Sequence, residues 1–281
     1  MTASTGPLVG PGSQPADEDG TVLDYMQMPS GMSTFSTPNL PEAEDIRGRA
    51  GALDALERVL AILQGWEADG PGHSVDVTGL GASDIDLVNQ VLGEGEVSAI
   101  GGARIQAQES VLAGVWRVRL TDDGGTLVRD MIEVARFPSM ILASVFSAAR
   151  VQLDIPDSFG PNIFNAPPLL PEINEHVAKS GAEVPPHVIN LSLLPHTEED
   201  LGFLNEILGR GPATILSRGY GNCRITATAT RNTWWVQYYN SQDALILNTI
   251  EISPIPEVAC AAREDISDSA ERLNEILEIY R

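Results

Sequence analysis

Residues 200–216, DLGFLNEILGRGPATIL, decide the fold, because residues 84–100, DIDLVNQVLGEGEVSAI, give nearly the same pattern earlier in the chain. The matched positions in this block keep an offset of 116 residues; they are Asn89, Leu92, Gly93 and Gly95 with Asn205, Leu208, Gly209 and Gly211. A later block keeps an offset of 118 residues and comprises Trp116, residues 132–134 and Pro138 with Trp234, residues 250–252 and Pro256. A hairpin between the blocks can absorb the two-residue difference. Recurrence on this scale predicts two pseudo-symmetric structural units.

The order of elements expected in each unit is helix, strand, helix, several strands and helix. Sequential hairpin strands between helices are typical of an α+β fold with a mostly antiparallel sheet. We therefore expect two pseudo-symmetric α+β repeats, at residues 45–153 and 169–281, joined by a linker at 154–168 that contains four prolines. Residues 1–44 are rich in Gly, Pro, Ser and Thr and lack a sustained period, which predicts a flexible N-terminal arm.

Hydrophobic periodicity predicts the individual elements. In the second unit these are helices at 169–180, 197–208 and 256–279 and strands at 187–193, 212–217, 222–229, 233–239 and 244–252. In the first unit they are helices at 43–68, 83–93 and 138–150, a strand at 75–78, and extended segments at 96–108, 111–120 and 127–135. Ser83 and Thr197 are expected N-caps, because their hydroxyl oxygens can accept from the first helical N–H groups. Gly93 and Gly209 are expected to end their helices, because glycine tolerates the left-handed conformation.

The chain of 281 residues has a formal net charge of −22 and a pI near 4.3. Contact with nucleic-acid phosphates needs clustered Lys and Arg, so this charge argues against a nucleic-acid partner. An acidic surface instead favours solubility and a cationic partner. No apolar stretch approaches the ~20 residues of a membrane-spanning helix, and the N-terminus has neither a basic nor an apolar signal region. We therefore expect a cytoplasmic protein without a membrane span.

Cys223 and Cys260 are the two cysteines, 37 residues apart. Neither has the close neighbour that chelating pairs use, so packing is the first interpretation, with redox chemistry and metal ligation left open. Proximity of the two would need the last helix to fold back along the sheet. The histidines form no zinc-protease pattern, and the chain has neither a G-x-S-x-G elbow nor a Walker A loop. We expect no catalytic residue.

The second unit carries polar residues, at predicted strand ends and hairpin turns, most of which the first unit lacks. The expected partner-binding residues are Arg218, Tyr220, Asn222, Arg224, Asn240, Gln242 and Asp243. A rigid sheet would present them to a partner. The first unit is expected to have Ala107 for Cys223, Leu142 for Cys260 and Asp122 for Asn240. The aromatic strand at 233–239 places alternate side chains on opposite faces, and which face is exposed stays open.

Three strings of the second unit resemble one protein family: SRGYGNCRI at 217–225, WWVQYYNSQDALILNTIEI at 234–252 and PEVACAAREDISDSAERL at 256–273. The chain resembles the HupH/HyaF/HoxQ family of hydrogenase expression/formation proteins, which mature [NiFe] hydrogenases. The resemblance is close over residues 162–281 and weaker over 40–150. It implies that residues 169–281 form a HupH-like C-terminal domain.

The same resemblance implies a non-catalytic chaperone for the iron–sulfur small subunit of a [NiFe] uptake hydrogenase. Such a protein binds the subunit during cluster assembly, or protects it before export. Its expected partners are that subunit and the thioredoxin-like and rubredoxin-like accessory proteins. No cofactor is expected, and an iron–sulfur cluster or metal at Cys223 and Cys260 would need further ligands from a partner. The alternative is a redox or iron/nickel delivery protein that uses these two cysteines.

Overall fold

The computed structural model describes residues 48–67, 70, 72–219 and 221–281. All of these described residues belong to one compact unit. The arm expected at residues 1–44 and the expected site residue Tyr220 lie outside the described residues.

Helices and antiparallel strands together give the α+β fold that the sequence predicts. The helices are α1 (Ala50–Gln64), α2 (Ala82–Leu92), α3 (Ser139–Val145), α4 (Leu169–Lys179), α5 (Glu198–Leu208) and α6 (Arg263–Glu278), with short 3-10 helices η1 (Leu191–Leu193) and η2 (Glu257–Ala259). The strands are β1 (His73–Asp76), β2 (Val97–Gly101), β3 (Ile105–Glu109), β4 (Val115–Thr121), β5 (Leu127–Val134), β6 (His187–Asn190), β7 (Arg210–Ser217), β8 (Asn222–Thr228), β9 (Thr233–Tyr239) and β10 (Leu245–Ile252).

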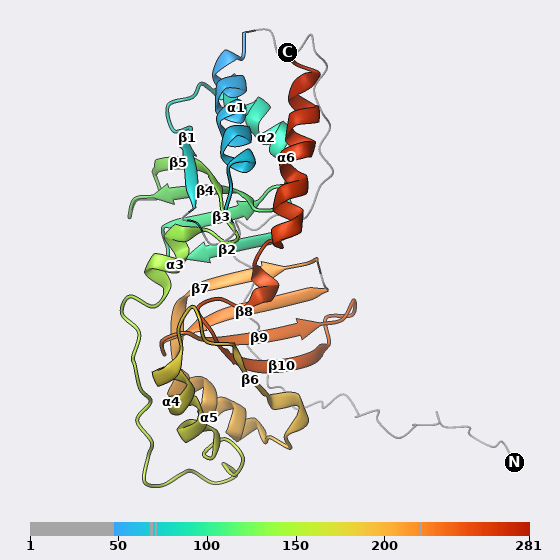
Figure 1. Ribbon diagram of the computed structural model, residues 1–281. Coiled ribbons are helices and arrows are strands. Elements are labelled where there is room, and N and C mark those ends of the chain that lie inside the picture. The colour runs from blue at the N-terminus through green and yellow to red at the C-terminus, as the bar shows by residue number, and fades with distance from the viewer. Residues whose placement is uncertain (1–47, 68–69, 71, 220) are drawn as a thin grey trace, which may run out of the picture. The chain divides into compact units, whose positions relative to one another are not determined.

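These strands form one 10-stranded sheet in the order β1-β5-β4-β3-β2-β7-β8-β9-β10-β6 (Figure 1). Every neighbouring pair in it is antiparallel. β2 and β7 form the central pair, so the strands of the first expected unit lie on one side of it and those of the second on the other. The two units therefore share a single sheet.

The strand order is the same from either edge when β1 to β5 are matched with β6 to β10. Ala99 faces Ile215 at the middle of the central pair, and these positions differ by the offset of the sequence recurrence. Val97 pairs with Ser217 at one end and Gly101 with Ala213 at the other. This register is compatible with a twofold axis through the central pair, and the repeat relation itself stays a prediction.

The register of two hairpins corrects one position of the sequence match. Gly101 pairs with Ile105 in the β2–β3 hairpin, whereas its match Ser217 pairs with Cys223 in the β7–β8 hairpin. The second hairpin therefore holds the two extra residues, and the counterpart of Cys223 is Ile105 rather than Ala107. An insertion of two residues at a hairpin tip leaves the ladder unchanged, because two residues are one full period of a strand.

Two helix starts differ from those expected. The N-cap of α2 is Gly81, without a side-chain capping bond, so the expected cap Ser83 is wrong and lies inside the first turn. The last helix begins at Arg263 rather than Pro256, because the backbone after η2 is extended at Cys260, with φ −99° and ψ 140°.

Two extended segments are also shorter than expected. The segment at 96–108 forms two strands, since the chain reverses at Gly102, whose φ is 63°. The strand expected to reach residue 193 ends at Asn190, whose side chain accepts a hydrogen bond from the Ser192 N–H and starts the 3-10 turn η1. Local side-chain bonding of this kind competes with strand pairing.

Other helix ends follow their local chemistry. Thr197 caps α5 in a capping box, accepting from the Asp200 N–H at 2.9 Å while the Asp200 carboxylate accepts from the Thr197 N–H at 3.1 Å. Gly93 and Gly209 cap the C-termini of α2 and α5 with φ of 56° and 65°. Both expectations for these helices, the N-cap of α5 and the two glycine ends, are confirmed.

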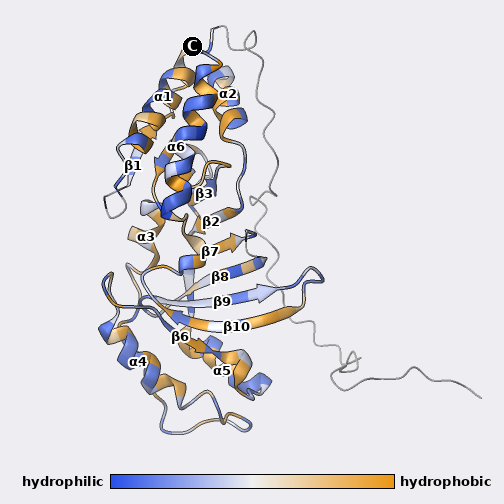
Figure 2. Cartoon of the chain, turned by 45° about the vertical axis from the view of Figure 1, so that its right-hand side comes forward, coloured by the Kyte–Doolittle hydropathy of each residue, from blue (hydrophilic) through white to orange (hydrophobic). Residues whose placement is uncertain are grey.

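Three hydrophobic clusters cover the sheet. On one face the side chains of the central strands, including Trp116 and Trp234, pack against α3 and the η2 segment. On the other face α1, α2 and α6 cover β1, β4 and β5, and α4 and α5 cover β6 and β10 (Figure 1). Each of these helices carries apolar and polar residues in alternating bands (Figure 2). The last helix thus packs on the strands of the first expected unit.

Candidate partner-binding site

The expected site residues gather at one end of the sheet. Asn222 at the start of β8 pairs with Tyr239 at the end of β9, so the β7–β8 and β9–β10 turns lie at the same end. The described expected residues at or near these turns are Arg218, Asn222, Arg224, Asn240, Gln242 and Asp243. Asn222, Gln242 and Asp243 are exposed, and the others are half-buried.

Arg224 lies on the sheet face opposite the Trp234 cluster. It pairs with Gln237 across β9, and its guanidinium carbon is 5.7 Å from the centre of the Tyr239 ring. The Tyr239 hydroxyl donates to Gln237 Oε1 at 3.2 Å. The quadrupole of an aromatic ring attracts a guanidinium placed over its face. This attraction holds the positive charge of Arg224 at its position on the sheet.

Glu96 is a neighbour of the β7–β8 turn that the sequence reasoning missed. Its carbonyl accepts a hydrogen bond from the Arg218 N–H at 3.1 Å, next to the Val97–Ser217 pair. A Cβ at Gly219 would collide with a Glu96 carboxylate oxygen, so a larger residue in this turn would push the exposed Glu96 side chain aside. No sequence signal identifies Glu96, because the central pairing of β2 with β7 alone brings it to the turn.

Asn240 builds the β9–β10 turn. Its side-chain oxygen accepts from the N–H groups of Gln242 at 2.8 Å and Ala244 at 3.0 Å. Asp122 does the same in the β4–β5 turn, accepting from Gly124 and Thr126, both at 2.9 Å. The exchange of Asp for Asn between the two turns therefore preserves one structural role.

The tip of the β9–β10 turn presents two exposed side chains, Gln242 and Asp243. Asp243 has a φ of 58°, at the position where the β4–β5 turn has Gly125 with a φ of 80°. Asp is one of the few residues other than glycine that enter the left-handed region readily. The second turn therefore adds a carboxylate where the first has no side chain.

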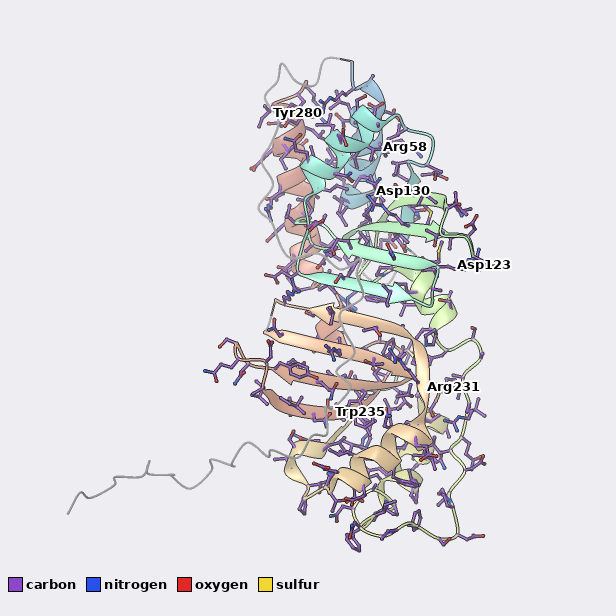
Figure 3. All side chains as sticks on the ribbon, turned by 180° about the vertical axis from the view of Figure 1, so that it is seen from behind. Arg58, Asp123, Asp130, Arg231, Trp235 and Tyr280 are labelled. Carbon is purple, nitrogen blue, oxygen red and sulfur yellow. The ribbon has the colours of Figure 1, made fainter. Side chains whose placement is uncertain are left out.

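The structure shows how the aromatic strand β9 is divided. Trp234 and Val236 are buried in the cluster beneath α3 and η2, and the Trp234 indole donates to the Ser253 carbonyl at 3.1 Å. Trp235, labelled in Figure 3, lies on the opposite face and donates to Asn248 Oδ1 at 2.5 Å. Trp235, Gln237 and Tyr239 are half-buried, so their face is the more accessible one.

Both cysteines are free thiols that pack against the same cluster as Trp234. Burial raises the pKa of Cys223 to about 12, although a hydrogen bond with Tyr238 opposes the shift. Burial also raises the pKa of Cys260 to about 12, and its Sγ donates to the Pro256 carbonyl at 3.7 Å. Both side chains are therefore protonated at neutral pH.

Carboxylates lie on the same face as the cysteines. Burial raises the pKa of Glu109 to about 7, against the opposing hydrogen bond from the Gly114 N–H at 3.2 Å. Burial also raises the pKa of Glu251, and Glu257 pairs with Arg136 nearby. Within the part of the chain that the structure describes, no group of three or more His, Cys, Asp or Glu side chains could hold a metal ion.

Comparison with known proteins identifies the class. The family model of the C-terminal conserved region of the HupH hydrogenase expression protein matches residues 50–150 and 163–280. The hydrogenase expression/formation proteins HupQ of Azotobacter chroococcum mcd 1 and HupH of Rhodobacter capsulatus are 47% and 48% identical, each alignment covering 97% of this chain and 96% of the relative. The hydrogenase-1 operon protein HyaF of Escherichia coli K12 is 32% identical, over 96% of this chain and 95% of the relative.

A solved structure of a hydrogenase expression protein HupH, from Thiobacillus denitrificans ATCC 25259, is 33% identical, with a TM-score of 0.36, and covers 41% of this chain and 94% of its own. The protein is thus one of the hydrogenase expression/formation proteins. Within that class the chain belongs to the HupH family. Among its described helices, none is both long and apolar enough to cross a membrane.

Proposed function

We propose that the protein is a non-catalytic maturation factor that binds the iron–sulfur small subunit of a [NiFe] uptake hydrogenase. Its relatives are named as hydrogenase expression/formation proteins, which supports a role in making a hydrogenase. The observation that carries the proposal is that the β7–β8 and β9–β10 turns lie at the same end of the sheet. Arg224 over Tyr239 and the exposed Asp243 give this end the fixed polar groups that a protein partner can recognise.

The state of the thiols supports this function over redox chemistry or metal delivery. The thiolate, rather than the thiol, attacks disulfides and binds metals. With pKa values of about 12, the Cys223 and Cys260 side chains stay protonated at cellular pH. A partner that opened this cluster would be needed to make either one reactive.

We also propose that the two halves are repeats of one unit. One family model matches both of them, and the strand order is the same from either edge of the sheet. In this proposal the second half binds the small subunit during cluster assembly or protection, and the first half supports the sheet. The thioredoxin-like and rubredoxin-like accessory proteins are further proposed partners, in the cytoplasm before export.

Copurification with a tagged hydrogenase small subunit tests the function. The variant carries Asn222→Ala, Arg224→Ala and Asp243→Ala together, which removes the polar groups without touching the buried face. We expect the full-length protein to copurify and the triple variant to lose at least about 90% of the captured subunit, since one central contact is often worth more than 1.4 kcal/mol.

The matched control lies at the opposite end of the sheet. Arg104→Ala, Gln106→Ala and Asp123→Ala change exposed residues at and near the β2–β3 and β4–β5 turns. We expect this variant to capture the small subunit as the unmodified protein does. Equal capture by both triple variants would contradict the proposed surface, and absence of capture by the unmodified protein would contradict the proposed partner.

A further inference from the structure

A second surface of the protein exposes several large apolar side chains. Leu193 is 79% exposed and Phe164 is 65% exposed. Leu194 and Phe159 are also exposed. Phe159 and Phe164 belong to the loop between α3 and α4. Leu193 and Leu194 belong to the segment at η1, which comes shortly before α5 in the sequence. Exposed apolar groups that gather in this way mark interaction sites more often than isolated ones do.

A buried carboxylate holds the first of these loops in place. Asp200 in the first turn of α5 is fully buried. Its Oδ1 accepts from the N–H groups of Phe164, Asn165 and Ala166, at 2.9, 3.0 and 2.9 Å. The backbone at Phe164 is thus fixed, while its ring points away from the core.

Side chains tie the two exposed segments to each other and to α5. Asn165 Nδ2 donates to the Pro195 carbonyl at 2.8 Å, which joins the loop to the segment that carries Leu193. The Thr197 hydroxyl donates to the Asn162 carbonyl at 2.6 Å. Asn162 Nδ2 donates to Glu199 Oε1 at 2.9 Å. A surface ordered in advance loses little conformational entropy when a partner binds to it.

The charge around this surface determines which partner fits. Residues 151–209 contain nine Asp and Glu residues but only one Lys and no Arg. The Nζ atom of this lysine, Lys179, lies 2.6 Å from Glu175 Oε1. The ion pair therefore adds no net positive charge to the surface. Glu198 and Glu199, next to the Asp200 anchor, are both exposed. Complementary charge steers a basic segment toward such an edge and rejects an acidic one.

We propose that residues 162–166 and 191–194 form a docking platform for a partner segment in which a bulky apolar side chain stands beside Arg or Lys. Phe164 and Leu193 contact the apolar side chain, and Glu198 and Glu199 attract the neighbouring cation. The inference deepens the proposed function, on which it rests, because the hydrogenase small subunit would supply the segment.

Synthetic peptides test the platform with the purified full-length protein. The probe is a fluorescein-labelled ten-residue peptide of alternating Leu and Arg, and fluorescence anisotropy measures its Kd. The comparison peptides alternate Leu with Glu and Ser with Arg. We expect the Leu–Arg peptide to bind at least about tenfold more tightly than either, because it alone satisfies both the apolar and the charged contacts.

Variants assign the binding to this surface. Phe164→Ser with Leu193→Ser removes its two most exposed apolar side chains, and we expect about tenfold weaker binding of the Leu–Arg peptide. Leu127→Ser with Val128→Ser is the matched control, since both residues are 46% exposed on β5. The control variant should bind as the unmodified protein does. All four positions are exposed, so both variants should unfold at the temperature of the unmodified protein.

Three outcomes would overturn the platform. They are equal binding by the Phe164→Ser/Leu193→Ser variant, equal binding of the Leu–Glu or Ser–Arg peptide, and conversion of a dimer to a monomer by the Phe164 and Leu193 changes. The peptide measurement contains no hydrogenase subunit. Peptide binding together with failed copurification would therefore contradict the proposed function alone, whereas copurification without peptide binding would contradict the platform alone.

Discussion

At the scale of single residues, three acids stand out on the face of the sheet that carries Trp116 and Trp234. The acids Glu109, Glu133 and Glu251 lie with the tryptophan cluster and are each largely buried, whereas Arg224 lies on the opposite face. Desolvation disfavours the charged form of a buried acid, and it is the largest cause of the raised pKa values of Glu109 and Glu251. An ionised Glu109 therefore lowers the stability of the fold at neutral and alkaline pH.

Replacement of Glu109 tests this at the residue scale. Its pKa is about 7 when folded and 4.5 in its ordinary state, so the folded protein holds the proton more tightly. Stability is full below pH 4.5 and is lost as the pH rises through 7, by at most about 3 kcal/mol. Glu109→Gln keeps the acceptor for Gly114 and should remove most of this loss. Urea unfolding at pH 5 and pH 8 should show a smaller decrease for the variant, and equal decreases would contradict the assignment.

Elements of the two halves meet the same backbone constraints. Gly95 follows α2 and Gly211 begins β7 after α5, and a Cβ at either would collide with a backbone carbonyl, of Ser110 or of Thr228. These carbonyls occupy matching places in β3–β4 and β8–β9. Trp116 and Trp234 likewise donate to the Ala135 and Ser253 carbonyls at 2.9 and 3.1 Å.

Alanine at the two glycines tests this at the scale of elements. Gly95→Ala and Gly211→Ala should each lower the free energy of unfolding by about 1–3 kcal/mol, because the backbone must move to admit the methyl group. Gly202→Ala in α5 is the control; nothing lies within 4 Å of its Cβ, so alanine should raise stability by about 0.5–1 kcal/mol. Urea midpoints measure all three. A neutral effect at either Gly95 or Gly211 would show that the close approach is absent there.

Within the described residues, the halves meet at the centre of the sheet, at α6 and in the cluster around Trp116 and Trp234. β2 pairs with β7 at the centre of the sheet, and α6, from the end of the chain, packs against α1 of the first half. Ile266, Leu273 and Leu277 of α6 are buried in the hydrophobic cluster that also contains side chains of α1 and α2. The linker expected at 154–168 thus lies between two stretches of sequence whose strands form one sheet and whose side chains share hydrophobic clusters.

A shared sheet should unfold as one cooperative unit. Leu273→Ala opens a cavity beneath α6, and Leu204→Ala opens one beneath α5 in the other cluster. Each should lower the free energy of unfolding by about 2–5 kcal/mol. Far-ultraviolet circular dichroism and tryptophan fluorescence should give a single coincident transition in urea for both variants. Separate transitions, with each substitution shifting only one, would contradict the single unit.

The sequence alone determined the features that depend on interactions between residues close together in the chain. The hydrophobic periods predicted the α+β class, Thr197 and Gly209 predicted the ends of α5, and the β9 alternation separated Trp234 from Trp235. The polar residues expected at the β7–β8 and β9–β10 turns do share one end of the sheet. Each of these features depends on residues a few positions apart, and such interactions repeat wherever the local pattern does.

Tertiary structure decided the rest. Only the central pairing of β2 with β7 made one sheet of two halves and brought Glu96 to the β7–β8 turn. Only the registers of the β2–β3 and β7–β8 hairpins matched Ile105 with Cys223. Only folding brought Asp200 to the N–H groups of Phe164 and its neighbours, more than thirty residues earlier. Contacts between segments so far apart depend on the free energy of packing the entire chain, which no local pattern of residues records.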